Sequence, residues 1–170
     1  MRQLIHLIAG FSLASALLFP FAAMAEPEII YLVRHGEKAA AGKDPDLTPL
    51  GQQRAHNIAT TLHRAGIQAI FSTPTARTLQ TAQPLAQQLK LPVQHYAADV
   101  PAALVKRVKA LHGAVLVVGH SNTLPELVRL FGGAPGADIG DDEYDRLYQL
   151  INGPDGKVTT VLLTSLPATR

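Results

Sequence analysis

The sequence predicts an α/β fold in which helices cover both faces of a sheet. Apolar runs rich in β-branched residues alternate along the chain with segments whose apolar residues recur at helical spacing. The run from Ala114 to Val118 is apolar throughout, as is typical of a strand at the centre of a parallel sheet. Neither a repeat nor a low-complexity tract interrupts this alternation, so we expect a single domain.

Residues 1–25 are predicted to be a cleaved signal peptide. Arg2 precedes an apolar stretch from Leu4 to Phe21, and Ala23-Met24-Ala25 has the small-x-small form of a signal peptidase site. The stretch approaches the ~20 residues that span a bilayer, so an anchor is the alternative. Pro20 and the polar residues after Ala25 favour cleavage. We therefore expect one domain over residues 26–170, periplasmic or secreted, without a stable membrane anchor.

The composition limits the kinds of partner. The chain has no cysteine, which excludes a lipoprotein anchor and disulfides, so the core alone must stabilise the fold. When Arg2 leaves with the signal peptide, the 15 Lys and Arg residues become 14, against 13 Asp and Glu. No basic cluster indicates nucleic acid. Any preference for anions must therefore come from a local site.

The expected elements follow one another in a regular order. They are a strand at Ile29 to Val33, a helix from Pro49 to about Arg64, a strand at Ala69 to Ser72, a helix from Pro74 to Leu89, an edge strand at Pro92 to Tyr96, a helix from Pro101 to Leu111, the central strand, a short helix from Thr123 to Phe131, and strands at Arg146 to Ile151 and Lys157 to Leu163. Thr48 and Pro49 form a typical helix start, and Gly66 is a plausible helix end. Pro84 is expected to kink or divide its helix. Gly36 is expected to allow a sharp turn after the first strand.

Phosphate-compatible side chains follow three of these strands. Arg34 and His35 come directly after the first, Arg77 lies one helical turn beyond the second, and His120 and Ser121 follow the central one. The carboxyl ends of parallel strands meet at one edge of a sheet, where open α/β folds bind ligands. A guanidinium group matches phosphate oxygens two at a time. The sequence therefore predicts a phosphate site at this edge.

Four segments resemble the histidine phosphatase superfamily, which also contains the cofactor-dependent phosphoglycerate mutases. They are Leu32 to Glu37, Leu47 to Ala55, Phe71 to Ala82, and Val117 to Asn122, in the order of the family. The resemblance implies a three-layer α/β/α sandwich with a mostly parallel central sheet. It also implies that His35 is the nucleophile that becomes phosphohistidine, and that Arg34, Arg77 and His120 form the rest of the phosphate pocket.

The chemistry of these residues is consistent with that role. A neutral imidazole can attack phosphorus in line, which splits hydrolysis into two displacements through a covalent intermediate. Positive charge from two arginines and a protonated His120 stabilises the transition state, so we expect the pKa values of His35 and His120 to be pushed apart. No cofactor is required. No histidine pair with a third ligand has metal-site spacing, so we expect no metal.

The general acid that protonates the leaving oxygen is less clear from the sequence. Asp99 is the only acidic residue between Thr81 and His120, which makes it the first candidate. The acidic loop before a late strand, with Asp141, Asp142 and Glu143, is the competing source. The third alternative is that no side-chain acid exists, so that the enzyme prefers phosphohistidine or anhydride substrates. Glu37 is expected to orient the pocket rather than to react.

The function predicted from the sequence is that of an exported, metal-independent phosphatase. Its substrate would be a small phosphorylated compound or a phosphorylated envelope glycan, and nothing in the sequence indicates an oligomeric state. A mutase would need a substantial lid to exclude water, for which the short connections leave little sequence. A serine hydrolase is disfavoured because the segment around Ser121 lacks the second glycine of the nucleophile elbow. A non-catalytic anion-binding or sensor domain is the alternative of a different class.

Overall fold

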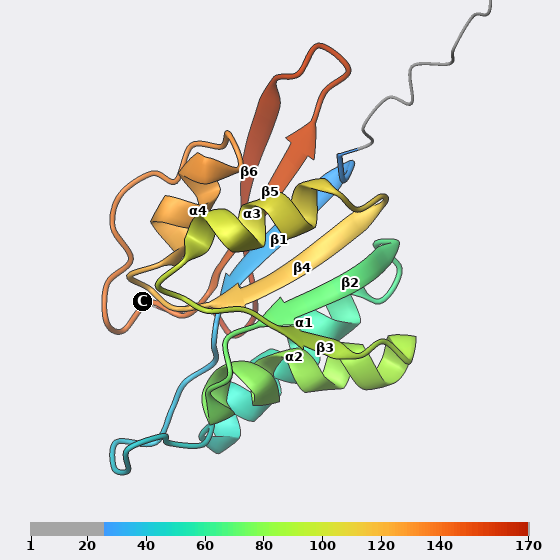
Figure 1. Cartoon of the computed structure of the whole chain (residues 1–170). Coiled ribbons are helices and arrows are strands. Elements are labelled where there is room, and N and C mark those ends of the chain that lie inside the picture. The colour runs from blue at the N-terminus through green and yellow to red at the C-terminus, as the bar shows by residue number, and fades with distance from the viewer. Residues whose placement is uncertain (1–25, 170) are drawn as a thin grey trace, which may run out of the picture.

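A six-stranded sheet with helices on both sides forms the body of the molecule (Figure 1). The computed structural model describes residues 26–169, so the predicted signal peptide lies outside the described residues. The elements are β1 (Ile29–Arg34), α1 (Pro49–Leu62), β2 (Ile67–Ser72), α2 (Ala76–Leu89), β3 (Val93–His95), α3 (Pro101–Lys109), β4 (Ala114–Gly119), α4 (Leu124–Leu130), β5 (Arg146–Asn152) and β6 (Val158–Thr164). None of the helices within residues 26–169 combines the length and the apolar character that crossing a membrane takes.

The sheet is mostly parallel, as predicted. Its strands lie in the order β3-β2-β4-β1-β5-β6, in which β1 to β4 run parallel and β5 and β6 form an antiparallel hairpin at one edge. Helices α1 and α2 cover one face, while α3 and α4 cover the other (Figure 1). The predicted three-layer sandwich is confirmed.

Alternating side chains of the strands form two hydrophobic cores. Ile30 and Leu32 of β1 pack into the core beneath α3 and α4, whereas Tyr31 and Val33 pack into the core beneath α1 and α2. Strand β4 lies between two parallel neighbours and is buried along its whole length, which explains its all-apolar sequence. Each large apolar side chain buried in this way stabilises the fold by roughly 1.5–3 kcal/mol.

Several helix boundaries differ by one or two residues from those predicted. Helix α2 begins at Ala76 rather than Pro74, and Pro84 lies inside one continuous helix instead of dividing it. Packing of α2 against α1 and the sheet outweighs the backbone hydrogen bond that a proline removes. Helix α1 ends at Leu62 rather than about Arg64, and Gly66, with φ of 71°, lies in the turn that follows.

The register of the strands brings the predicted site residues to one edge. Arg34 is opposite Gly119 in the β1–β4 pair, and Ser72 is opposite Val118 in the β2–β4 pair. The three strands therefore end within about one residue of one another. The backbone N–H of His35 donates to the carbonyl of Gly119 (3.0 Å), which holds the end of β1 against the end of β4.

Candidate active site

His35 is buried directly after β1, in a single defined tautomer. Its side chain and backbone together are only 3% exposed. Nδ1 lies 2.7 Å from the carbonyl oxygen of Gly36. A carbonyl can only accept a hydrogen bond, so Nδ1 carries the proton and Nε2 has a free lone pair. Burial, together with the nearby positive charges of Arg34 and Arg77, lowers the pKa of His35 to about 3, so the ring is neutral.

Gly36 is required by close packing and not by a turn conformation. A Cβ atom on Gly36 would lie 2.7 Å from the carbonyl oxygen of Gly51, in the first turn of α1. Its φ is not positive, so the predicted sharp turn is wrong as an explanation for the glycine. Its N–H donates to the hydroxyl of Thr81 in α2 at 2.9 Å. The chain after His35 is thereby held against both α1 and α2.

Arg34 is held by the backbone of the distant acidic loop. Its Nη1 donates to the carbonyl oxygens of Gly140 (2.8 Å), Asp141 (3.0 Å) and Glu143 (2.8 Å). Its guanidinium carbon lies 4.0 Å from the centre of the Tyr144 ring. Nε of Arg34 is buried and has no hydrogen-bond partner. A buried charged donor without a partner marks a place where a ligand oxygen can bind.

Arg77 approaches the same space from the second residue of α2. Its Nη1 lies 3.3 Å from Oδ1 of Asp44, and its Nη2 lies 3.4 Å from Nδ1 of His120. Its Nε is also buried without a partner. Within residues 26–169, Nε of Arg34 and Nε of Arg77 are the two buried side-chain nitrogen or oxygen atoms that lack a partner. The two unpaired positive donors make this edge of the sheet the candidate anion-binding site.

His120 follows β4 and faces His35, with 5.4 Å between the two ring centroids. Arg77 can only donate, so Nδ1 of His120 accepts, and Nε2 donates to the hydroxyl of Thr73 at 2.9 Å. Burial, together with the charges of Arg77 and Arg34, lowers the pKa of His120 to about 4. The prediction that the pKa values of His35 and His120 are pushed apart is wrong, because both are lowered. Both rings are desolvated and face the same arginines, so both pKa values fall.

A group of threonine hydroxyls supports His120, and sequence reasoning did not find it. Thr73 accepts from His120 and contacts the hydroxyl of Thr78 at 2.9 Å, while Thr75 contacts Thr78 at 2.8 Å. Thr73 is 2% exposed. Its position directly after β2, at the same edge as the other strand ends, was the signal that could have identified it.

Tyr144 is a second residue of the pocket that the sequence did not reveal. Its ring centroid lies 5.9 Å from that of His35, and its face covers the guanidinium of Arg34. An aromatic residue inside an otherwise acidic loop was the available signal. Ser121, in contrast, is half-buried after β4, and no hydrogen bond joins its side chain to another described residue. Its predicted contact with phosphate stays a prediction.

The candidate acids are not placed alike. Asp99 lies on an exposed turn between β3 and α3, where its side chain forms no hydrogen bond with the described residues. Asp141 and Asp142 are exposed, and their charges partly offset the lowering of the Arg34 pKa that burial causes. Glu143 is paired with Arg146 and accepts from the N–H of Gly140 (3.2 Å), and its pKa is lowered, mainly by the Arg146 hydrogen bond. A carboxylate held in this way is a poor proton donor.

Glu37 supports the pocket from behind. Its carboxylate accepts from Nη2 of Arg54 at 2.6 Å, and Arg54 is fully buried in α1. Nη1 of Arg54 in turn donates to the carbonyl of Ser165 at 2.8 Å. The pair therefore ties the loop after β1 to α1 and to the C-terminal segment. Such a position agrees with the expected orienting role and gives Glu37 no contact with the two histidines.

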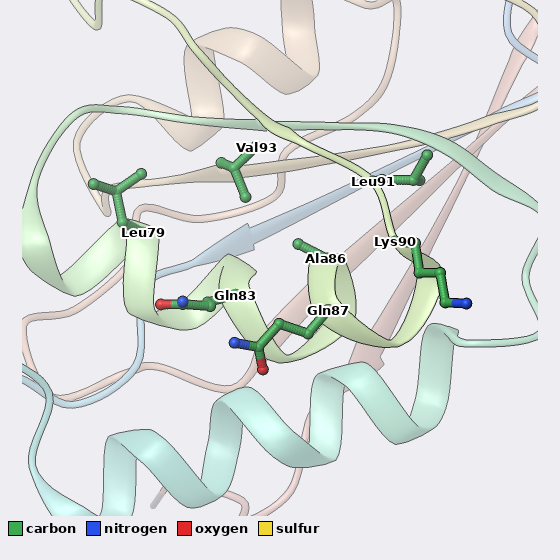
Figure 2. A pocket seen from close by; sticks show the side chains of 7 residues that line it. All are labelled: Leu79, Gln83, Ala86, Gln87, Lys90, Leu91 and Val93. Atoms are coloured by element: carbon green, nitrogen blue, oxygen red, sulfur yellow. The ribbon is translucent and has the colours of Figure 1, made fainter.

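A hollow elsewhere on the surface has few reactive side chains. A hollow of about 420 Å³ lies between α2 and β3 (Figure 2). It is lined by Leu79, Gln83, Ala86, Gln87, Lys90, Leu91 and Val93. Lys90 is the one side chain of this lining that ionises, and the others are amides or hydrocarbons. No group of three or more His, Asp or Glu side chains in residues 26–169 is arranged to hold a metal ion.

Comparison with known proteins agrees with this pocket. Residues 30–98 match the sequence model of the histidine phosphatase superfamily (branch 1). The probable phosphoglycerate mutase GpmB of Proteus mirabilis (strain HI4320) is 37% identical over 71 residues, which are 38% of this chain and 33% of that protein. GpmB of Escherichia coli O139:H28 is 29% identical over 137 residues, covering 76% of this chain and 53% of that protein. The chain thus spans between a third and about half of the length of these relatives.

The fold is also found among solved structures. The protein histidine phosphatase SixA in complex with tungstate superposes with a TM-score of 0.64 at 20% identity, covering 81% of this chain and 96% of that one. Residues 30–98, which match the superfamily model, contain Arg34, His35 and Arg77, the residues of the pocket that come from the first half of the chain. Fold and pocket define the class as α/β proteins with a histidine-and-arginine anion site. Residues 30–98 of this chain are thus similar to the histidine phosphatase superfamily, branch 1.

Proposed function

We propose that this protein is a phosphatase that hydrolyses phosphate monoesters through a phosphohistidine at His35. The observation that carries the proposal is the state of its ring: Nδ1 is held by Gly36, and Nε2 is free in a pocket with two unpaired arginine donors. In the first step Nε2 forms a bond to phosphorus as the ester P–O bond breaks. In the second step water attacks phosphorus, the N–P bond breaks, and inorganic phosphate leaves.

The two arginines act where negative charge lies during both steps. Nε of Arg34 and Nε of Arg77 are buried without a partner, so each has a hydrogen bond to donate to phosphoryl oxygens. His120 has a pKa of about 4 in this structure, so its ring is neutral near pH 7. A bound dianion favours the charged imidazolium, so substrate binding raises the pKa of His120 and gives the transition state a further positive donor. Substrate binding thus favours protonation of His120.

Trapping the intermediate tests the proposal. Rapid quench with a labelled phosphate ester should yield a protein adduct that is stable in alkali and labile in acid, as a phosphoramidate is. H35A should abolish the adduct and the turnover while the far-UV spectrum stays unchanged. H56A, which removes an exposed histidine of α1, is the matched control. An adduct of the opposite stability, or one that persists in H35A, would rule out the mechanism.

The leaving group decides between two versions of this function. If Asp99 protonates the leaving oxygen, D99N should slow the hydrolysis of alkyl phosphates by roughly two to four decades and barely affect p-nitrophenyl phosphate. D141N, D142N and E143Q should then be mild. If one of these loop variants shows the leaving-group-dependent loss instead, the acid lies in the loop.

A phosphatase without a side-chain acid is the second candidate function. Asp99 is exposed without hydrogen bonds to the described residues, and Glu143 is paired with Arg146, so neither is held in the pocket of this structure. Such an enzyme would act on phosphohistidine or an anhydride, whose leaving groups depart without protonation. Equal rates of all four variants with alkyl phosphates, together with fast turnover of a phosphohistidine peptide, would support this version.

Transfer to a second substrate position is the alternative to hydrolysis. Some relatives carry the name of a mutase, but the chain covers only a third to about half of their length. The turn between β3 and α3 and the segment between β4 and α4 are short, which favours access of water to the intermediate. Release of inorganic phosphate from a phosphoglycerate, without interconversion of its isomers, is the expected outcome of a direct assay.

The proposed setting is outside the inner membrane. The support for export is the sequence of residues 1–25, with Arg2, the apolar stretch and the Ala-x-Ala site. In that setting the substrate would be a small phosphorylated compound or a phosphate on an envelope glycan. Cell fractionation with an N-terminal sequence that starts at Glu26 would support export, and full-length protein in the cytoplasm would contradict it.

A further inference from the structure

Asp44 binds one side of Arg77 at the rim of the pocket. Its carboxylate accepts from Nη1 of Arg77 at 3.3 Å and from the backbone N–H of Ala76 at 3.0 and 3.1 Å. Asp44 comes from the long connection between β1 and α1, and its side chain is half-exposed, whereas that of Arg77 is 19% exposed. The contact joins a loop residue to the first turn of α2, 32 positions further along the chain.

The contact compensates for a missing helix cap. Thr75 occupies the N-cap position of α2, but its hydroxyl makes no capping hydrogen bond because it contacts Thr78 and lies next to Thr73. Asp44 supplies the acceptor that the helix start lacks, and a carboxylate there is also favoured by the helix dipole. The backbone N–H of Ala76 is therefore not open to a substrate anion.

Asp44 also decides which donors of Arg77 remain for a ligand. It takes Nη1, while Nη2 points to His120 and Nε stays buried and unpaired. Nε and Nη2 lie on the same edge of the planar guanidinium and form a two-pronged fork suited to two phosphate oxygens. Arg34 is arranged in the same way, with Nη1 bound to three carbonyls and Nε unpaired.

We propose that Asp44 is a positioning residue, which holds Nη1 of Arg77 so that its Nε and Nη2 face the phosphoryl group; this rests on the proposed function. The carboxylate binds the nitrogen outside this fork, so it does not compete with phosphate for the same donors. An exposed ion pair contributes little to stability, so fixing the orientation of Arg77 is the larger consequence. Asp44 itself touches neither His35 nor His120.

A neighbouring carboxylate offers a matched control. Asp46 fastens the same loop to the same helix through Nε2 of Gln80 (2.6 Å), but it does not contact Arg77. Variants D44A and D46A therefore both remove an exposed carboxylate and one attachment of the loop. Only D44A releases the guanidinium. If Asp44 served merely to fasten the loop, the two variants would behave alike.

Binding of inorganic vanadate and phosphate, measured by calorimetry, tests the positioning directly. D44A should weaken vanadate binding about tenfold, and D46A by less than about twofold, at similar melting temperatures. In the R77A background, D44A should change vanadate inhibition and kcat/KM by less than about twofold, since Asp44 acts through Arg77. Tighter binding by D44A, an equal effect of D46A, or an undiminished D44A effect in R77A would each overturn the proposal.

The same measurements separate this proposal from the proposed function. Calorimetry requires no turnover, so a wild-type protein that binds vanadate without hydrolysing any ester would contradict the phosphatase and leave the test of Asp44 intact. Conversely, a protein that forms the His35 adduct normally in D44A, with unchanged vanadate affinity, would retain the phosphatase and reject the positioning role.

Discussion

The two arginines of the pocket are anchored by different parts of the chain, although each leaves its Nε free. Arg34 is 5% exposed, and its Nη1 is held by three backbone carbonyls of the loop before β5. Arg77 lies nearer the surface, and its Nη1 is held by the half-exposed side chain of Asp44. One anchor is main chain and buried, and the other is a single side chain at the rim.

The difference shows that Arg34 is held rigidly, whereas the orientation of Arg77 is easily changed. Carbonyl oxygens at Gly140, Asp141 and Glu143 do not depend on the side chains at those positions, so Arg34 stays in place as long as the loop keeps its path. The orientation of Arg77 depends on one carboxylate that a single substitution removes. We therefore expect Arg34 to couple activity to stability, and Arg77 to affect activity alone.

Removing each arginine is expected to have the largest effect and tests whether the two anchors differ. R34A and R77A should each lower kcat/KM by about 100- to 1,000-fold, the usual loss for one oxyanion donor. R34A should also lower the free energy of unfolding, by about 1–3 kcal/mol, because it leaves buried carbonyls of the loop without a donor. Urea denaturation measures the second effect. Equal stability of R34A and R77A would contradict the proposed difference between the anchors.

Each arginine has a histidine beside it, and the pH dependence of stability tests whether the two histidines are neutral. The folded-state pKa values of about 3 for His35 and about 4 for His120 lie below the ordinary value of 6.5. Between these values the unfolded chain binds more protons, so the free energy of unfolding should fall as the pH falls from about 6.5 to about 4. Each histidine contributes at most about 1.4 kcal/mol per pH unit. The measurement is urea denaturation across this pH range.

Substitution separates the contributions of the two histidines. H35Q and H120Q should each reduce the slope of stability against pH by about one proton, because glutamine does not titrate. H56Q, at an exposed position of α1, should leave the slope unchanged. If H35Q leaves the slope intact, His35 is not the neutral buried group that the mechanism requires.

Arg146 braces the acidic loop and so supports the anchor of Arg34. Arg146 pairs with Glu143 and donates to the carbonyl of Ala137, so it fixes the path of the loop that binds Arg34. R146A should lower kcat/KM about tenfold by loosening these carbonyls, an effect typical of supporting contacts. K157A, which breaks the exposed pair with Asp155 in the β5–β6 hairpin, is the control and should be silent. An unchanged R146A enzyme would show that the carbonyls hold Arg34 without this brace.

Tyr144 should have the smallest effect. Its ring lies over the Arg34 guanidinium at 4.0 Å, a contact worth about 0.5–2 kcal/mol. Y144A should therefore raise the vanadate inhibition constant several-fold, whereas Y144F, which keeps the ring, should match the wild type. A strong effect of Y144F would instead assign a role to the hydroxyl group.

Much of the fold could be predicted because its signals are local. The all-apolar β4, the Thr48-Pro49 helix start and the periodicity of the helices depend on neighbours in sequence, and the structure confirms each of them. The convergence of Arg34, His35 and His120 followed from one general rule about the carboxyl ends of parallel strands. Pro84 does not divide its helix, because tertiary packing outweighs its local effect.

Local sequence signals place His35, Arg34, Arg77 and His120 at the pocket, because these residues lie where strands and one helix begin or end. How those side chains are held depends on contacts between distant parts of the chain. The hydrogen bonds of Arg34 join residues 106 to 109 positions apart, and that of His120 to Thr73 joins residues 47 apart. No periodicity records such contacts. The shared neutrality of the two histidines likewise arises from joint burial, which depends on every element packed around them.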